Sequence, residues 1–205
     1  MGGRAGGGAS GGMGSRSRGG MSGRANQLAN QYLGGVNNPA LKKELASALA
    51  EYEREFGLPA GLTITMGGTD ALGKINGLNQ LHLNSGYESG QRTTAEARKT
   101  FIHELTHGID KTDTHRSGNI SGIKMQGWKP VGVLKSENKG FEKKLTSAYK
   151  HFKSHYGSSD TKAIGQYALK SKHEFFAEAL SSHMTGTQNK YTTFAYNLAK
   201  SMSGK

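Results

Sequence analysis

The chain has 205 residues, of which 27 are Lys or Arg and 15 are Asp or Glu, so its formal net charge at pH 7 is +12. It contains no cysteine, which excludes disulfide bonds and metal sites built from thiolates. No segment approaches the roughly twenty consecutive apolar residues that a membrane-spanning helix requires. We therefore expect a soluble protein without a membrane span.

The first 24 residues form a low-complexity segment. They include 11 Gly and four Arg but no acidic residue, and such a composition cannot bury a core. We predict a disordered tail or linker over residues 1–24 and one globular domain over residues 25–205. The arginines also predict weak contact with nucleic acid or another anionic surface, and a plain linker is the alternative. The sequence does not determine the oligomeric state.

The tail contains no apolar run that resembles the core of a signal peptide. We therefore expect the protein to be cytoplasmic, associated with a virion, or exported by a route that uses no signal peptide.

Secondary-structure signals along the rest of the chain predict an α+β fold. A helix is predicted over residues 38–56, because Asn38 and Pro39 are typical of a helix start. Short strands follow over residues 62–66 and 80–83, between Gly-rich turns. Beyond an irregular stretch over residues 112–138, helices are predicted over residues 140–156, 159–169, 172–184 and 189–202. A small mixed or antiparallel sheet would thus precede a mainly helical body.

A further helix is predicted between the sheet and this body, ending by about Asp110. Thr93 and Glu96 have the spacing of a capping box at its start. Residues 103–107 of this helix read His-Glu-Leu-Thr-His, the HExxH pattern of zinc peptidases.

The HExxH pattern has a chemical meaning only on a helix. His103 and His107 are four residues apart and therefore share one helical face, so both imidazoles can bind one metal ion. Glu104 lies beside that face, where its carboxylate can act as a general base toward water activated by the metal. The alternative is a solvated helix on which the two His are incidental.

A catalytic zinc ion takes three protein ligands and keeps one position open, so HExxH requires a third ligand. Asp113 lies six residues after His107, which is the spacing of one known arrangement. That arrangement has Gly midway, whereas this chain has Asp110, which lacks the conformational freedom of Gly. His115 is a further candidate, without a matching spacing.

The other candidate for the third ligand is Glu174. Glu174 and Glu178 are four residues apart on one predicted helix, so the first could bind zinc while the second accepts the ring N–H of a ligating His. Ser171 and Glu174 also have the spacing of a capping box. The pattern alone therefore supports a metal ligand and a helix cap about equally.

Two motifs carry a family resemblance. HELTHGID at residues 103–110 and EFFAEAL at residues 174–180, with Tyr167 seven residues before the second motif, resemble the catalytic domain of anthrax lethal factor and its relatives, including the Pro-Pro endopeptidases. The resemblance implies a zincin-like domain of the gluzincin type, with one catalytic zinc ion. It assigns His103, His107 and Glu174 as ligands, Glu104 as the base, Tyr167 as an assisting group and Glu178 as the partner of a ligating His.

The implied activity is zinc-dependent hydrolysis of peptide bonds in a protein or peptide substrate. The resemblance also suggests a toxin or effector role, while a maturation or housekeeping peptidase fits the same residues. Peptidases of this kind often bind an extended substrate along the edge strand of a sheet, and we expect the strand around His82 to be that edge.

A different class of function also fits the sequence. HExxH segments preceded by a Thr-Phe pair, here Thr100 and Phe101, are similar to peptidase-type domains carried in phage head and other virion proteins. A basic arm would suit assembly around nucleic acid. On this interpretation the chain is a virion or packaging component with a vestigial peptidase site.

Overall fold

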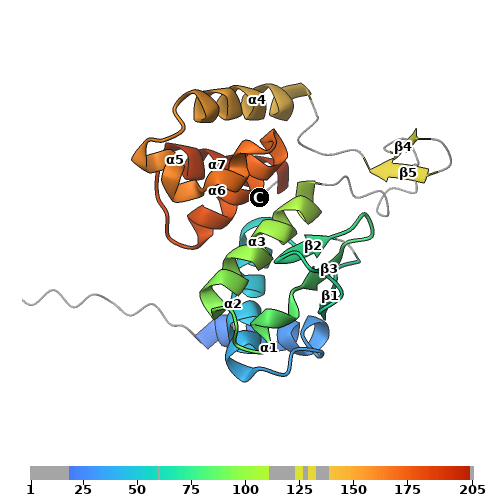
Figure 1. Ribbon diagram of the computed structural model, residues 1–205. Helices are drawn as coiled ribbons and strands as arrows, with labels where there is room; N and C mark the ends of the chain where they lie inside the picture. Colours follow the sequence, from blue (N-terminus) through green and yellow to red (C-terminus); the bar gives the residue numbers. More distant parts are fainter. Residues whose placement is uncertain (1–18, 60, 111–122, 127–128, 133–138, 204–205) are drawn as a thin grey trace, which may run out of the picture.

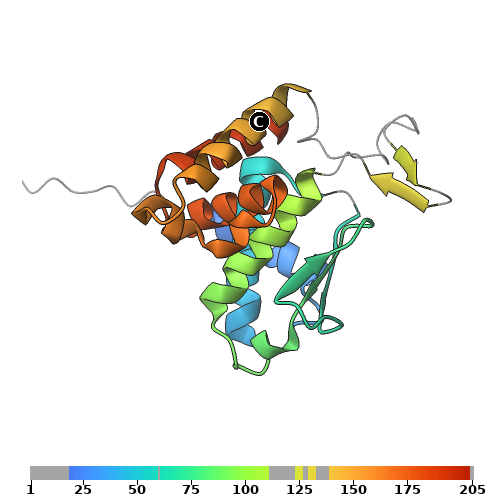
Figure 2. The same ribbon diagram turned by 45° about the horizontal axis from the view of Figure 1, so that its top comes forward.

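The computed structural model describes residues 19–59, 61–110, 123–126, 129–132 and 139–203. It confirms the predicted α+β fold, because a small mixed sheet is followed in the chain by a helical body, as in zincin-like metallopeptidases (Figure 1). The helix that carries HExxH lies between the two, and it packs on the sheet on one side and on the helical body on the other (Figures 1 and 2).

The part of the chain before the helical body contains helices, strands and one short 3-10 helix. In chain order these are α1 (Gly19–Tyr32), α2 (Pro39–Phe56), β1 (Thr63–Met66), β2 (Gly73–Ile75), β3 (Gln80–Leu83), η1 (Ser85–Tyr87) and α3 (Thr94–Asp110).

The described residues of the second part form two paired strands and four helices, with a 3-10 turn between two of the helices. In chain order these are β4 (Ile123–Gln126), β5 (Lys129–Gly132), α4 (Lys139–Ser154), α5 (Ser159–Ile164), η4 (Gln166–Leu169), α6 (Lys172–Met184) and α7 (Lys190–Ser203). The stretch predicted as irregular over residues 112–138 thus contains β4 and β5, which pair antiparallel.

Helix caps behave as the sequence predicts. The side chain of Asn38 accepts hydrogen bonds from the N–H groups of Ala40 and Leu41, each at 3.1 Å, and α2 begins there. At the start of α3, Thr93 Oγ1 accepts from the N–H of Glu96 at 3.1 Å, and a Glu96 carboxylate oxygen accepts from the N–H of Thr93 at 2.8 Å. This reciprocal pair satisfies N–H groups that the first helical turn leaves unbonded.

Helix α1 was not predicted. It begins at Gly19, so its first turns lie within the segment predicted as a disordered tail, and residues 1–18 lie outside the described part. Leu28 and Leu33 are fully buried, and the Arg24 guanidinium pairs with Glu53 of α2. Packing on α2 therefore holds a helix whose Gly-rich start has a low intrinsic helix propensity.

The sheet has three strands in the order β1-β3-β2. β1 pairs parallel with β3, and β2 pairs antiparallel with it, with Lys74 opposite His82. The expectation that the strand around His82 forms the edge of the sheet is therefore wrong, because β3 is the central strand. The edge strand that lies against α3 is β2, whose three residues show no alternating pattern long enough to predict it.

The helix predicted over residues 159–169 is divided in two. Gly165 has a φ of 111°, in the left-handed region that favours glycine, and α5 ends just before it. The chain then continues as the 3-10 turn η4, which contains Tyr167. Because the helix is interrupted at Gly165, the Tyr167 side chain points in a different direction from the one it would have on a continuous helix.

The core is continuous through both parts of the chain. On α3, Phe101, Ile102 and Leu105 have no exposed surface, and on α6 Phe175 and Leu180 have none either. These apolar stripes explain why the two helices pack together. Among the described residues, none of the helices combines the length and the apolar composition needed for a membrane span.

A polar network joins the last residues of α2 to α7. The Tyr196 hydroxyl donates to Glu55 Oε2 at 2.6 Å, and Lys200 Nζ lies 3.0 Å from the same oxygen. The hydrogen bond from Tyr196 is the main reason that the pKa of Glu55 falls to about 2, and this bond also raises the pKa of Tyr196 to about 12.

This network predicts a pH dependence of stability. A carboxylate whose pKa is lower in the folded state stabilises the fold above its unfolded pKa, and this contribution is lost as pH falls toward its folded pKa. Between about pH 5 and pH 2, the free energy of unfolding should fall by about 1–2 kcal/mol more in the wild type than in Glu55→Gln. Urea unfolding at several pH values measures this, with Tyr196→Phe as an intermediate case. If the free energy of unfolding fell equally with pH in the wild type and in Glu55→Gln, this prediction would be contradicted.

Candidate metal centre

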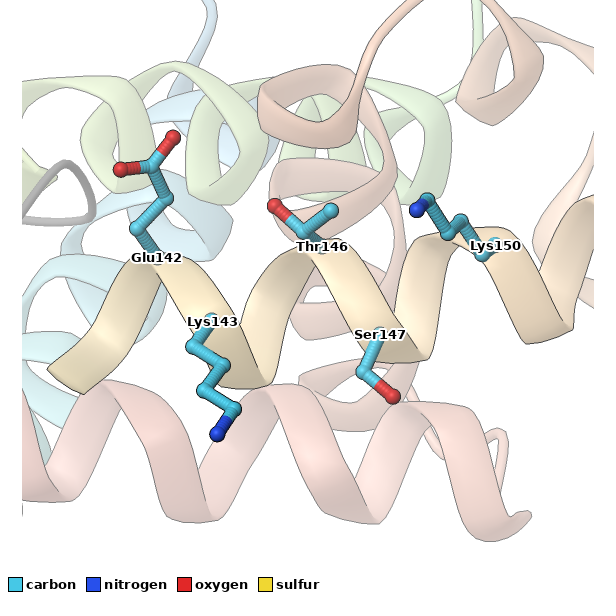
Figure 3. A pocket seen from close by; sticks show the side chains of 5 residues that line it. All are labelled: Glu142, Lys143, Thr146, Ser147 and Lys150. Carbon is cyan, nitrogen blue, oxygen red and sulfur yellow. The ribbon is translucent and has the colours of Figure 1, made fainter. Parts of the chain in front are cut away.

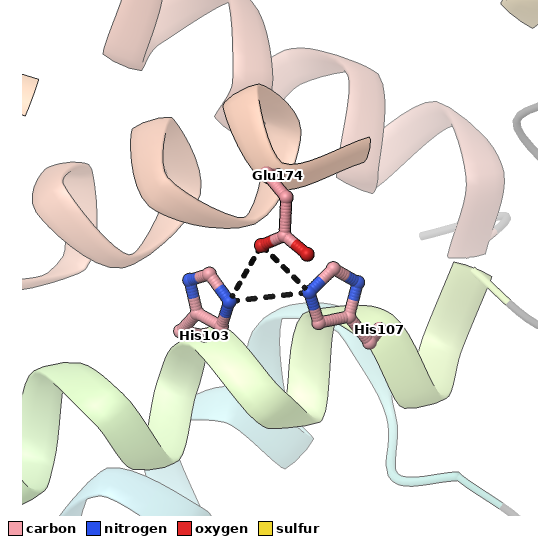
Figure 4. A group of neighbouring side chains, drawn as sticks. All are labelled: His103, His107 and Glu174. Atoms are coloured by element: carbon pink, nitrogen blue, oxygen red, sulfur yellow. Dashed lines mark hydrogen bonds and ion pairs between the residues drawn. The ribbon is translucent and has the colours of Figure 1, made fainter. Parts of the chain in front are cut away.

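Three potential ligand atoms converge where α3 meets α6. His103 Nε2 lies 3.1 Å from His107 Nε2, and Glu174 Oε2 lies 3.2 Å from the first nitrogen and 3.4 Å from the second. Figure 4 shows the two imidazoles rising from one helix toward the carboxylate that descends from the other. Within the described part of the chain, no other group of three His, Cys, Asp or Glu residues has this arrangement.

The three atoms fit a small divalent cation. Ligand bonds of about 2.0–2.1 Å in a tetrahedral zinc site place neighbouring ligand atoms about 3.3–3.4 Å apart, close to the separations seen here. Among the described residues, Glu174 Oε2 is buried without a hydrogen-bond partner, as expected of an oxygen that awaits a cation. The Nε2 atoms of the two imidazoles face each other at hydrogen-bond distance. A donor set of two imidazoles and one carboxylate suits zinc and leaves a fourth position open.

The carboxylate of Glu174 faces the two imidazoles rather than the start of its own helix. Ser171 Oγ accepts a hydrogen bond from the backbone N–H of Glu174 at 3.1 Å, so the start of α6 is capped by the serine. The carboxylate of Glu174 points instead at the two imidazoles (Figure 4). The cap thus fixes the first turn of the helix from which the candidate ligand projects.

Glu178 lies one turn further along α6 and contacts the other side of His103. Its Oε1 lies 3.2 Å from His103 Nδ1, which is the position predicted for the partner of a ligating His. Burial alone would lower the pKa of His103, but the carboxylates of Glu174 and Glu178 outweigh burial and raise it to about 9. Burial would raise the pKa of both carboxyl groups, but contact with His103 holds each below its usual range. The site therefore favours positive charge between the carboxylates.

Glu104, the candidate general base, is held by the edge strand. It is buried, and its Oε2 accepts a hydrogen bond from the backbone N–H of Ile75 in β2 at 2.9 Å. The amide that donates this bond points away from β3. It holds Oε2 of Glu104 in place and makes no bond to Oε1.

Gly73 allows β2 to approach α3 closely at this point. A Cβ atom at Gly73 would lie 2.7 Å from Thr100 Cγ2 and 3.0 Å from Glu104 Cγ. Carbon atoms this close overlap, so any larger residue would push the strand away from the helix. The absence of a side chain at Gly73 therefore sets the distance between the edge strand and the candidate base.

Tyr167 faces the same site from η4. Its ring centroid lies 5.9 Å from that of His103, and 46% of the residue is exposed. Lys170 Nζ lies over the ring, 3.7 Å from its centroid, a contact that favours the present orientation of the ring. The tyrosine predicted to assist catalysis therefore lies beside the candidate metal ligands and is accessible to a substrate.

A cavity of about 520 Å³ is bordered by His103, Glu104, Tyr167 and Glu178. Its lining comes from the segment leading into β2, from α3, from η4 and its end, and from α6: Ala71, Leu72, Gly73, Glu96, Lys99, Thr100, His103, Glu104, Tyr167, Lys170 and Glu178. A second hollow, of about 450 Å³, lies on α4 and is lined only by side chains of that helix, Glu142, Lys143, Thr146, Ser147 and Lys150 (Figure 3). None of the candidate site residues that the structure describes lines this second hollow, whereas His103, Glu104, Tyr167 and Glu178 line the first.

Asp113, the alternative third ligand, and His115 lie outside the described residues. Sequence reasoning missed Lys99, Gly73 and Ile75. The sequence could have identified Lys99 as a site residue, because it lies four residues before His103 and so shares its helical face. It could not have identified Gly73 and Ile75, since their role depends on how β2 packs against α3.

A helix with HExxH, a Glu from a second helix and an adjoining sheet edge is the arrangement of a metallopeptidase domain. The family model of glucose-regulated metallo-peptidase M90 matches residues 65–189, which is more than half of the chain and includes both motifs. The chain belongs to this family of metallopeptidases.

No curated protein and no solved structure matches the chain. The family match supports the metallopeptidase domain that the motifs predicted. It does not extend to the narrower resemblance to lethal factor and the Pro-Pro endopeptidases, which stays a prediction.

The contact at Gly73 gives a test of the site's construction. Gly73→Ala should lower the free energy of unfolding by about 1–3 kcal/mol, because the new methyl group overlaps Thr100 and Glu104. The matched control is Gly77→Ala, since a Cβ atom at Gly77 would meet nothing within 4 Å. Chemical denaturation of both variants decides the point, and equal stability of the two would mean that β2 does not approach α3 as described.

Proposed function

We propose that the protein is a zinc-dependent endopeptidase that hydrolyses peptide bonds of a protein substrate. The observation that carries this proposal is the convergence of His103, His107 and Glu174 beside the buried carboxylate of Glu104. His103 and Glu104 also line the cavity of about 520 Å³. Membership of a metallopeptidase family supports it.

Zinc held by His103, His107 and Glu174 would supply a Lewis acid for the scissile carbonyl and for the attacking water. Glu104 accepts the proton of that water and later delivers it to the leaving nitrogen. The N–H of Ile75 keeps one oxygen of Glu104 in place, so the other oxygen carries the proton. The base is thereby oriented before a substrate binds.

Tyr167 supplies a hydrogen-bond donor from η4, at the wall of the same cavity. Its phenol can donate to the oxyanion that develops on the scissile carbonyl, where a fixed donor is most effective. Exposure of the ring and its place beside His103 support this role.

The edge strand β2 offers a docking site for an extended substrate. Leu72 O accepts from Asn84 N–H, and Asn76 N–H donates to Gln80 O, each at 3.1 Å, so the bonds to β3 are made at alternate residues. Gly73 and Ile75 lie between these positions and direct their backbone groups away from β3. The Ile75 N–H is used by Glu104, which leaves the N–H and C=O of Gly73 for the substrate main chain.

Separate roles for the base and the ligands predict separate effects of substitution. Glu104→Ala should keep zinc and lose cleavage by about 10²–10⁴-fold, because only proton transfer is removed. His103→Ala should lose both zinc and cleavage, whereas His82→Ala, on the central strand, should retain both. Cleavage of a peptide library with and without a chelator, together with metal content, measures these outcomes. Full activity of Glu104→Ala would contradict the mechanism.

A further inference from the structure

The buried carboxylate of Glu178 has a different partner at each oxygen. Oε1 lies 3.2 Å from His103 Nδ1, and Oε2 lies 3.3 Å from Lys99 Nζ. Only 16% of the Glu178 side chain is exposed, compared with 37% of the Lys99 side chain. The contacts form a continuous line from a partly exposed ammonium group, through a buried carboxylate, to a candidate metal ligand.

Helix geometry places Lys99 at the start of this line. It precedes His103 by four residues on α3, so the two side chains lie on the same face, one turn apart. Lys99 Nζ also lies 3.5 Å from the backbone carbonyl oxygen of Ile164, the last residue of α5. The ammonium group therefore bridges three helices around one carboxylate.

We propose that Lys99 is a positioning residue of the metal centre, which acts through Glu178 to fix the orientation of the His103 ring. The proposal rests on the zinc site proposed above. A carboxylate that accepts the ring N–H of a ligating His orients the ring and raises its basicity. That effect requires the carboxylate itself to be held, and Lys99 holds the oxygen that His103 does not use.

A merely structural ion pair would have a different effect. Partly exposed ion pairs contribute little to the stability of a fold, because water competes for both charges and the side chains lose conformational freedom. Loss of groups that orient a metal ligand, by contrast, typically weakens metal binding by about 10- to 100-fold. Lys99 is one contact further from the metal, so a smaller but measurable effect is expected.

The chain contains a matched control at some distance from the site. Lys200 Nζ lies 3.0 Å from Glu55 Oε2 and 3.4 Å from the backbone carbonyl oxygen of Glu55, and 33% of its side chain is exposed. It thus makes the same two kinds of contact as Lys99, with similar exposure, but its carboxylate partner belongs to the network between α2 and α7. Lys200→Met removes an equivalent ion pair without touching His103.

The test compares zinc binding by the full chain in the wild type, Lys99→Met, Lys99→Arg and Lys200→Met, with zinc alone competed against a chromophoric chelator. We expect Lys99→Met to weaken zinc binding by about 3- to 10-fold, Lys99→Arg to restore most of the affinity, and Lys200→Met to match the wild type. The absorption bands of the cobalt(II)-substituted protein should also shift in Lys99→Met alone, and circular dichroism checks that each variant is folded.

The possible failures are distinguishable. If the wild type binds zinc and Lys99→Met binds it equally well, or no worse than Lys200→Met, the role of Lys99 is overturned while the zinc site stands. If the wild type binds no zinc, the proposed zinc peptidase fails, and the role of Lys99 fails with it.

Discussion

The packing of α3 against α6 is the interaction on which the site depends. The two helices lie far apart in the sequence, and their apolar stripes, with Phe101 and Phe175 both fully buried, bring them together. This contact places two imidazoles and two carboxylates in a partly desolvated space, an arrangement that is costly unless the charges are paired. The neighbouring carboxylates outweigh burial and raise the pKa of His103, and a divalent cation would compensate for their charge more completely.

The edge strand imposes the second constraint. β2 must lie close enough to α3 for an amide to reach Glu104, and Gly73 permits this approach. The N–H of Ile75 in this strand thereby orients the candidate base.

Local patterns predicted much of this structure. HExxH, the capping box at Thr93, the strands β1 and β3 and the helices from α2 onward could be predicted because they depend on residues close in sequence. The edge at β2 and the turn at η4 were not, since the first is set by packing on α3 and the second by the backbone at Gly165. The sequence also could not decide whether Glu174 caps its helix or faces the imidazoles, because that depends on how α3 packs against α6. Three further expectations stay predictions: the virion alternative, which rests on the Thr-Phe pair before HExxH and the basic tail; contact of the tail with nucleic acid or another anionic surface; and the toxin role, which rests on the narrower resemblance.

The most direct test of a three-residue zinc site is the metal content of the purified full chain after dialysis, measured by mass spectrometry beside Glu174→Ala. The geometry predicts about one zinc ion per wild-type chain and a much lower content in the variant, because the remaining two imidazoles bind zinc weakly. The variant should remain folded by circular dichroism. A wild-type chain that holds no zinc even after zinc is added back, or a variant that holds as much as the wild type, would contradict the proposed centre.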